Sequence, residues 1–195
     1  MELIVVILIV GILAVTVMSR FESSRLIPAQ DQLVGHLRYT QHLAMNDDRY
    51  DPSNVLWHQE RWQMLLSAPT VSGDPTREYA LYVIFSDRDH GGFPSTAEIA
   101  VSPLDSEALG TPTGQFPTYQ GITKVSLHFG ISDIASSCGS HIAFDQMGRP
   151  YGFSGAHNNL YRDLLPTQCI ITITHPDEGD ARICIEPFTG YIHGC

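Results

Sequence analysis

The chain begins with a run of apolar side chains. Residues 3–18 carry no charge and Thr16 is their only polar side chain, while Glu2 precedes the run and Arg20 follows it. A helix across a bilayer needs about 20 apolar residues, whereas about 10 to 14 are typical of a buried helix or a signal segment. No Lys or Arg precedes the run, as a cleaved signal peptide would require. The β-branched residues and the terminal position therefore favour a membrane segment over a buried helix.

Apolar positions continue after this run, now with polar residues between them. Leu33 and Leu37 belong to a series spaced by three, four or seven residues, which is the spacing of one helix face. Pro28 removes one N–H donor and crowds the preceding turn, so a kink near residues 24–28 is expected. The helix is expected to end at residues 46–51, where Asp residues collect. Its second half is therefore amphipathic and suited to pack on a domain.

Beyond residue 52 the pattern changes to short apolar runs with a period of two. This period predicts half-buried β-strands, and Gly, Pro, Asp and Ser residues separate the runs as turns. The predicted strands are residues 54–58, 61–67, 79–86, 98–101, 123–129, 141–145, 169–174, 181–186 and 191–193. Because the strands are short and follow one another with turn residues between them, an antiparallel sheet is expected rather than βαβ units.

The two patterns together predict an α+β fold, in which one long N-terminal helix packs on an antiparallel β-sheet domain. Residues 1–19 form a hydrophobic transmembrane or assembly segment of that helix, and residues 20–50 form its amphipathic half. Residues 51–195 form the globular β-rich domain. A domain of that length is able to bury a core of its own.

The net charge of the chain argues against one class of partner, nucleic acid. The chain has 11 Lys and Arg residues against 21 Asp and Glu residues, which gives a net charge of −10, and Lys124 is its only lysine. Binding to nucleic acid relies on clustered Lys and Arg side chains that neutralise phosphates. We therefore expect no nucleic-acid partner.

The sequence shows no catalytic constellation. Its nine His residues include no HExxH pair, which a zinc protease would require. Residues 152–157 approximate the nucleophile elbow of a hydrolase, but the second Gly comes one position too early. We therefore predict that the chain is not an enzyme and holds no cofactor.

Asp87 and Asp89 place two carboxylates two residues apart in a Gly-rich loop. This spacing matches a fragment of a calcium-binding loop, but the fragment is interpreted as lacking the following ligands and the terminal glutamate. A solvated turn is the favoured interpretation. No metal is therefore predicted, with Asp87 and Asp89 as the candidates for a calcium site.

Several segments resemble known protein families. Glu2, directly followed by the apolar run, resembles the N-terminal signature of type IV pilins and type II secretion pseudopilins. Residues 37–44, 142–150 and 189–192 resemble, in that order, the helix motif, the strand–turn motif and the C-terminal turn and last strand of minor pseudopilins of the GspH/FimT type. The resemblance extends over most of the chain and implies a type IV pilin-like fold.

The resemblance also implies a function. A minor pseudopilin of a bacterial type II secretion system is anchored in the inner membrane by its N-terminal helix, with the globular domain in the periplasm. The subunit then assembles with other pseudopilin subunits, on an inner-membrane assembly platform, into a pseudopilus that helps to export folded proteins. Such a subunit acts by binding, without a reaction of its own.

Glu2 and Gly11 are the expected assembly residues. In the pilin family the glutamate is implied to pair with the N-terminal amine of a neighbouring subunit, because an unpaired charge within a bilayer is costly. The alternative is that Glu2 lies at the membrane interface and only favours the positive N-terminus of the helix. Gly11 is the expected point at which such helices thin or pack closely.

Family members carry a short basic leader that a prepilin peptidase removes. Only Met1 precedes Glu2, so we expect the true start to lie upstream, with the prepilin peptidase as a further partner. Such a leader would bring the apolar run to about the 20 residues of a membrane span. It would also supply positive charge on the cytoplasmic side.

Four cysteines follow the apolar segment, in a domain that the resemblance places in the oxidising periplasm. A hairpin that turns at residues 176–179 would place Cys169 opposite Cys184, at a separation that a disulfide is able to bridge. We therefore predict the disulfides Cys169–Cys184 and Cys138–Cys195. Four free thiols in a reducing compartment are the alternative, and the absence of a CxxC pair disfavours a metal site.

Two alternative functions stay open. A minor pilin of a type IV pilus, used in adhesion, motility or DNA uptake, would have nearly the same sequence pattern. A membrane-anchored periplasmic enzyme or binding protein would use the helix only as an anchor. A deep pocket with convergent polar groups would favour this last alternative.

Overall fold

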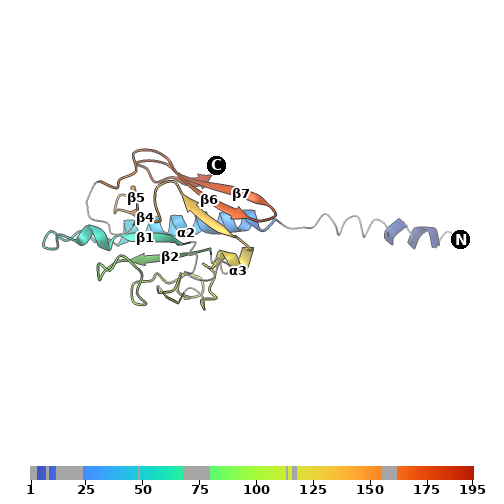
Figure 1. Ribbon diagram of the computed structural model, residues 1–195, viewed down its shortest axis with the longest axis horizontal. Coiled ribbons are helices and arrows are strands. Elements are labelled where there is room, and N and C mark those ends of the chain that lie inside the picture. Colours follow the sequence, from blue (N-terminus) through green and yellow to red (C-terminus); the bar gives the residue numbers. More distant parts are fainter. Residues whose placement is uncertain are drawn as a thin grey trace.

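The computed structural model describes residues 4–7, 9–11, 24–47, 49–67, 80–112, 114–115, 118–154 and 162–195. Residues 4–7 and 9–11 are helical. The elements that follow them are α2 (Leu26–Asn46), the 3₁₀-helix η1 (Trp57–Glu60), β1 (Trp62–Ser67), β2 (Leu81–Ser86), α3 (Val125–Phe129), β3 (Asp133–Ser136), β4 (His141–Phe144), β5 (Pro150–Phe153), β6 (Cys169–His175), β7 (Gly179–Ile185) and β8 (Ile192–Gly194). Figure 1 shows this order along the chain.

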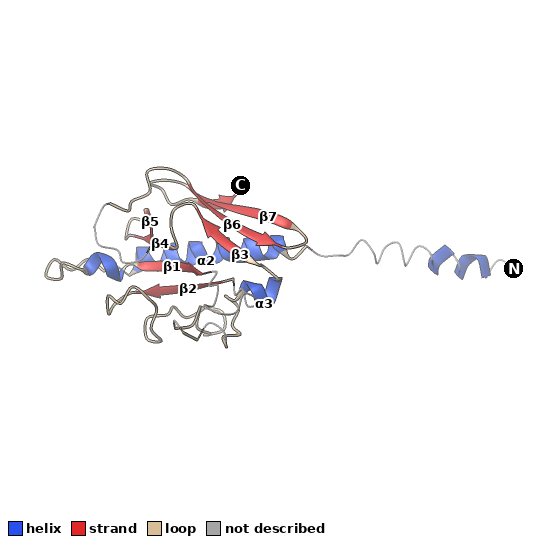
Figure 2. Cartoon of the chain, viewed as in Figure 1, coloured by secondary structure: helices blue, strands red, loops and turns tan. Residues whose placement is uncertain are grey.

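The strands form two antiparallel sheets. One sheet has the order β2-β1-β4-β5, the other has the order β3-β6-β7-β8, and every pairing within them is antiparallel. Helix α2 contacts strands of both sheets and runs along them in Figures 1 and 2. The predicted α+β arrangement, a long helix packed on antiparallel strands, is therefore confirmed for the described residues.

One face of α2 forms the centre of the hydrophobic core. Its buried residues are Leu26, Ala29, Leu33, Leu37, Thr40 and Ala44. Successive members of this series are three or four residues apart, which is the spacing that the sequence pattern predicts for one helix face. The apolar members pack in one cluster with strand residues from both sheets, among them Met64 and Ile183. Burial of this stripe therefore joins the two sheets through the helix.

The two ends of α2 follow local sequence signals. The helix begins at Leu26, so Pro28 lies in its first turn, where a backbone N–H has no partner within the helix and its loss costs little. The helix ends at Asn46, and the next backbone N–H, that of Asp47, donates to Leu43 O at 2.9 Å. The predicted C-terminal end is confirmed. The predicted kink stays a prediction, because residues 12–23 lie outside the described residues.

Three of the predicted strands are wrong. Residues 123–129 alternate apolar and polar side chains, yet the last five of them form α3, which buries only Val125. Residues 54–58 form a turn and the start of η1, and residues 98–101 form isolated bridges only. The sequence pattern also omits β3 and β5, each four residues long. Over so few residues, alternation does not distinguish a strand from a short helix that buries one side chain.

Within the residues that the structure describes, no helix has both the length and the apolar character needed to cross a membrane.

Candidate functional site

The N-terminal helix presents a surface of exposed apolar side chains. Six of them are between 51% and 68% exposed: Ile4, Val5, Val6, Ile7, Ile9 and Val10. Among the described residues, a Cβ atom added at Gly11 would meet nothing within 4 Å beyond the helix's own backbone, so another helix is able to approach closely there. Glu2 lies outside the described residues, and its pairing stays a prediction. Burial of apolar area is favourable by about 25 cal/mol per Å², which suits this surface to contact with lipid or with other helices.

A side chain from the hairpin β6–β7 holds the start of α2. Glu178 lies in the turn of that hairpin, and its Oε1 accepts a hydrogen bond from Arg25 N at 2.9 Å. Its Oε2 accepts bonds from Ser24 Oγ at 2.5 Å and from Leu26 N at 3.0 Å. The Arg25 N–H, the Ser24 hydroxyl and the Leu26 N–H lower the pKa of Glu178 to about 2. The carboxylate therefore caps α2 at its N-terminal end, a contact that no local sequence signal indicates.

The structure brings together the three segments that resemble pseudopilin motifs. Gln41, from α2, donates through Nε2 to Gly148 O at 2.8 Å and to Gly190 O at 3.1 Å. Gly148 lies in the turn between β4 and β5, and Gly190 lies between β7 and β8. Both have positive φ angles, +76° and +65°, and a Cβ atom at Gly190 would lie 2.2 Å from Gly148 O. We call this contact of helix and two turns the motif junction.

Asp145 fixes the turn that carries Gly148. Its Oδ1 accepts hydrogen bonds from the backbone N–H groups of Met147 and Arg149 at 3.0 Å and 2.9 Å. Its Oδ2 accepts bonds from Arg149 Nε at 2.7 Å and from the Tyr151 hydroxyl at 3.2 Å. Asp145 is only 2% exposed, and both of its oxygens have partners. Its role is therefore to hold this turn in one conformation.

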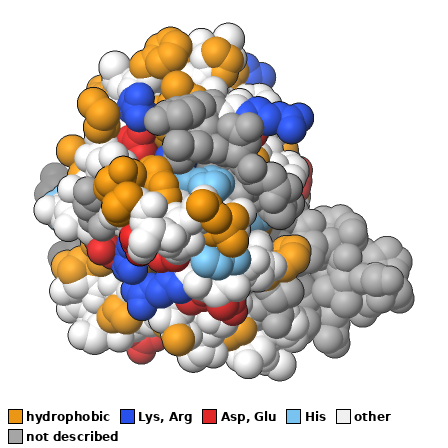
Figure 3. Space-filling model, turned by 90° about the vertical axis from the view of Figure 1, so that its left-hand side faces the viewer, with side chains coloured by type: hydrophobic (Ala, Val, Ile, Leu, Met, Phe, Trp, Pro, Cys, Tyr) orange, Lys and Arg blue, Asp and Glu red, His pale blue; other side chains and the backbone are white. Residues whose placement is uncertain are grey.

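Apolar side chains stand exposed beside the motif junction. Met147 and Tyr191 directly precede or follow the two glycines and are 67% and 61% exposed. The Met45 sulfur lies 3.2 Å from the position that a Cβ atom at Gly148 would take. Figure 3, which views the end of the molecule opposite the N-terminal segment, shows hydrophobic side chains in several groups among Arg and His residues. Met147 and Tyr191 therefore supply exposed contact area beside the motif junction.

The predicted disulfide pairing is wrong. The disulfides are Cys138–Cys169 and Cys184–Cys195, with Cα–Cα separations of 5.5 Å and 5.9 Å. In the hairpin β6–β7, Cys169 pairs with Ile185 rather than with Cys184. Because neighbouring residues of a strand point to opposite faces, this shift of one residue places Cys169 and Cys184 on opposite faces of the sheet. The expectation that the four cysteines form disulfides is confirmed in the structure.

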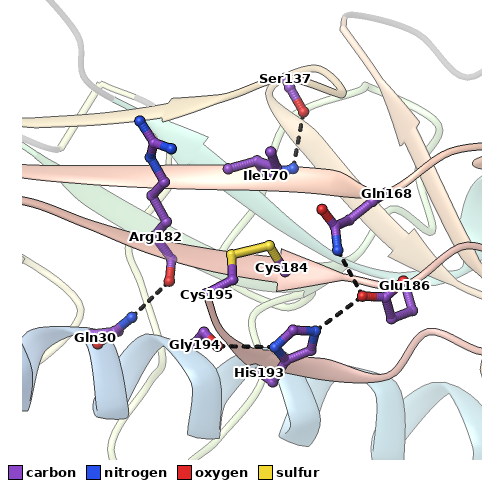
Figure 4. The surroundings of a disulfide bond; sticks show 10 residues. All are labelled: Gln30, Ser137, Gln168, Ile170, Arg182, Cys184, Glu186, His193, Gly194 and Cys195. Atoms are coloured by element: carbon purple, nitrogen blue, oxygen red, sulfur yellow. Dashed lines mark hydrogen bonds and ion pairs between the residues drawn. A yellow bond between two sulfur atoms is a disulfide. The ribbon is translucent and has the colours of Figure 1, made fainter.

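The Cys184–Cys195 disulfide holds the end of the chain against β7. Figure 4 shows it beside His193, whose Nε2 lies 3.0 Å from Glu186 Oε1. The backbone N–H of Cys195 also donates to Arg182 O at 3.1 Å, and Gln30 of α2 donates to the same oxygen at 2.6 Å. The last strand is therefore linked covalently to the sheet and by hydrogen bonds to the helix.

The loop after β2 gathers three acidic side chains. One carboxylate oxygen from each of Asp87, Asp89 and Glu98 lies within 4.8 Å of the other two. Glu98 Oε1 accepts from Arg88 N at 2.7 Å and from Asp89 N at 2.9 Å. Its Oε2 accepts from the Ser95 hydroxyl at 2.6 Å and from Ser95 N at 2.9 Å. Burial raises the pKa of Glu98, but these hydrogen bonds outweigh it and leave the pKa below its usual value.

Asp87 is the least satisfied member of this acidic loop. It is 5% exposed, and its Oδ2 accepts one hydrogen bond, from Gly92 N at 3.0 Å. Its Oδ1 is buried without a hydrogen-bond partner. Burial, together with the neighbouring charges of Glu98 and Asp89, raises the pKa of Asp87 to about 6. A buried carboxylate oxygen of this kind is costly unless a cation or a donor satisfies it.

Glu98 is the acidic residue that the sequence interpretation omits. With Asp87 as position 1, Asp89 occupies position 3 and Glu98 occupies position 12. The interpretation that the loop lacks a terminal glutamate is therefore wrong. The sequence signal was the spacing of twelve residues, and the fold completes it because Ile99 returns to pair with Phe85 of β2.

An open groove lies beside the Cys138–Cys169 disulfide. Its described walls include Cys138, Gly152 and residues 162–168. Arg162 and Asp163 are the charged side chains of these walls, while Cys138 is disulfide-bonded and provides no thiolate.

Comparison with protein-family models, with curated proteins and with solved structures found no match to this chain. The family resemblance therefore rests on the sequence segments themselves, and the function drawn from it is a proposal.

Proposed function

We propose that this chain is a minor pseudopilin of a type II secretion system, which acts by assembly and not by catalysis. The observation that carries the proposal is the exposed apolar helix that precedes a domain built from one long helix and two antiparallel sheets. An apolar helix whose described side chains are more than half exposed is suited to a membrane and to a helical bundle of subunits. The domain itself is acidic and would lie in the periplasm, where disulfides persist.

The motif junction gives the proposal a second support. Three short segments far apart in the sequence resemble pseudopilin motifs one by one, and they meet in space at Gln41. Unrelated chance resemblances have no reason to meet at one group of hydrogen bonds. The junction would keep α2 and the two turns rigid, so that force applied through the N-terminal helix moves the domain as one body.

Assembly would then use the N-terminal helix. Its exposed apolar side chains pack between helices of neighbouring subunits after leaving the lipid, and Gly11 lets a neighbouring helix approach closely. Glu2 pairs with the N-terminal amine of the next subunit, because a carboxylate in an apolar bundle needs a cationic partner. The Glu178 cap holds the start of α2 against the β6–β7 hairpin of the globular domain.

Deletion of the gene, with secretion and pilus formation assayed in parallel, tests the proposal. Loss of exoprotein secretion with normal pili supports the pseudopilin assignment. Loss of pili with normal secretion would instead establish the minor pilin of a type IV pilus. Normal results in both assays would contradict both assembly functions.

A substitution tests the expected assembly residue. Glu2→Ala is expected to leave the protein in the membrane fraction and to reduce its crosslinking to other pseudopilins by about tenfold or more, because the amine would lose its partner. Asp31→Ala, which removes an exposed carboxylate from α2, serves as the control and should crosslink normally. Equal crosslinking of both variants would contradict the role of Glu2.

A further inference from the structure

The acidic loop begins and ends at one place in the fold. Phe85 of β2 forms a β-bridge with Ile99, and Ser86 N donates to Glu98 O at 3.1 Å. Residues 87–98 therefore form a closed loop on the end of β2. This closure brings the first and last carboxylates of the loop together, although eleven positions separate them in the sequence.

The polar residues of this loop have a recognisable spacing. With Asp87 as position 1, carboxylates stand at positions 1, 3 and 12, Gly92 stands at position 6 and Ser95 at position 9. The 12-residue calcium loop of EF-hand proteins takes ligands from positions 1, 3, 5, 7, 9 and 12 and needs Gly at position 6 for a sharp turn. Gly92 has a φ angle of +76°, and its N–H donates to Asp87 Oδ2. The backbone therefore makes its sharp turn at the position where a calcium loop requires it.

The negative charges of this loop have no positive charge paired with them among the described residues. Only 5% of the Asp87 surface is exposed, and its Oδ1 has no hydrogen-bond partner. Among the described residues, none of the three carboxylates forms an ion pair with an Arg, Lys or His side chain. The nearby imidazole of His90 faces Glu60 instead, at 3.3 Å. Three carboxylate oxygens held within 4.8 Å of one another repel unless a positive charge lies between them.

We propose that the loop of residues 87–98 binds a calcium ion through the carboxylates of Asp87 and Asp89. Glu98, whose oxygens already accept four hydrogen bonds within the loop, adds a third negative charge beside the ion. Phe93 and Ser95 stand at positions 7 and 9, from which the 12-residue pattern takes a main-chain carbonyl and a further oxygen ligand. Gly91, at position 5, has no side-chain ligand, so a water molecule would supply the oxygen there. An all-oxygen donor set selects a hard cation over zinc or copper. Calcium is favoured over magnesium because it accepts six to eight ligands in flexible geometry, whereas magnesium demands a nearly ideal octahedron.

The bound ion would offset the repulsion among the three carboxylates of a loop that hydrogen bonds to Glu98 hold together. It would satisfy the buried Asp87 oxygen and join both ends of the loop to β2, so the domain would gain stability with rising calcium concentration. Loops of this kind in extracellular modules bind calcium with dissociation constants on the order of 10⁻⁴–10⁻³ M. This inference does not depend on the proposed pseudopilin function, since it concerns residues of the globular domain alone.

Calorimetric titration of the full chain in detergent, after treatment with a chelator, tests the site with calcium chloride alone as the probe. One ion is expected to bind per chain, and the thermal midpoint is expected to rise with calcium. Asp89→Asn removes an exposed ligand and should weaken binding by about tenfold or more, since affinity follows the number of charged ligands. Asp87→Asn is the second variant and should do the same.

Asp105→Asn is the matched control. Asp105 is also exposed in a loop and accepts a hydrogen bond two residues ahead, from Glu107 N, as Asp89 does from Gly91 N. Its substitution should leave calcium affinity unchanged. The proposal is overturned if the wild-type chain shows neither calcium binding nor a shifted midpoint at about 10 mM, well above the expected constants. Wild-type affinity in Asp89→Asn, or magnesium binding as tight as calcium binding, would overturn it equally.

Discussion

Two loops of the domain contain a buried aspartate and turn at a glycine, but the two carboxylates differ in their hydrogen-bond and ion-pair partners. In the turn between β4 and β5, both oxygens of Asp145 have partners, and Arg149 supplies a positive charge. In the loop of residues 87–98, Asp87 keeps one buried oxygen without a partner beside two further acids. A buried aspartate thus has hydrogen-bond partners on both oxygens in one loop and on only one oxygen in the other.

This difference separates a structural carboxylate from a candidate ligand. Asp145 has donors on both oxygens and the positive charge of Arg149 beside it, so it stabilises the fold and a cation has nothing to add there. A buried charge left incomplete costs stability unless something outside the chain satisfies it. The turn of Asp145 carries the motif junction, whereas the loop of Asp87 is suited to receive an ion.

The largest expected effect comes from the same substitution in each loop. Asp145→Asn is expected to lower the free energy of unfolding by about 3 kcal/mol, because Arg149 then faces an amide instead of its charge partner. Asp87→Asn, in calcium-free buffer, should change that free energy by only about 0.5 kcal/mol, as it removes repulsion rather than attraction. Urea unfolding measures both values. Equal losses would show that the two carboxylates play the same role.

A smaller difference is expected between two glycines that share one backbone conformation. Gly148 and Gly92 both have φ angles of +76°, so Ala at either position should cost about 1 kcal/mol in strain. A Cβ atom at Gly148 would also lie 3.1 Å from Gln41 Nε2, whereas at Gly92 it meets nothing within 4 Å. Gly148→Ala should therefore cost about 1 kcal/mol more, through a disturbed hydrogen bond. Thermal unfolding of the pair measures the difference, and identical midpoints would show that the junction tolerates a side chain.

The smallest effect concerns Glu178, a carboxylate with hydrogen-bond donors on both oxygens but at the surface. Its pKa is lowered from 4.5 to about 2 in the folded protein, so the folded state binds fewer protons than the unfolded state between these values. The stability from this cap is therefore present above pH 4.5 and is lost as the pH falls toward 2. Glu178→Gln should flatten this acid-induced loss in unfolding curves measured from pH 5 to 2, while Glu107→Gln, another exposed carboxylate, should not. An unchanged acid limb in Glu178→Gln would contradict the capping role.

Much of the fold was predictable because its signals are local. The stripe through Leu33 and Leu37 predicts the buried face of α2, since burial selects every third or fourth residue of a helix. Strands β1, β2, β4, β6 and β7 are long enough, or apolar enough, for their runs to stand out. Where a run is short, as at α3, the helix period of about 3.6 residues and the strand period of two fit the same few residues. The pattern then predicts the wrong element.

The candidate sites were predictable only in part. Asp87 and Asp89 stand out by their spacing, but the role of Glu98 depends on the closure of the loop against β2. The disulfide pairing was the least predictable feature, because a register shift of a single residue in the β6–β7 hairpin decides which face each cysteine occupies. Register is set by the turn and by the packing of a whole face, and neither is a property of the cysteines themselves.

The sequence by itself determined the apolar N-terminal segment, the amphipathic helix and the antiparallel character of the domain, because periodicity of burial is written along the chain. Only the tertiary structure decided which cysteines pair, that Gln41 joins two distant turns, that Glu178 caps α2 and that three acids share one loop. These are contacts between residues far apart in sequence, and each depends on the angle and register with which packed elements meet. Such geometry is fixed jointly by the whole core, so no single segment encodes it.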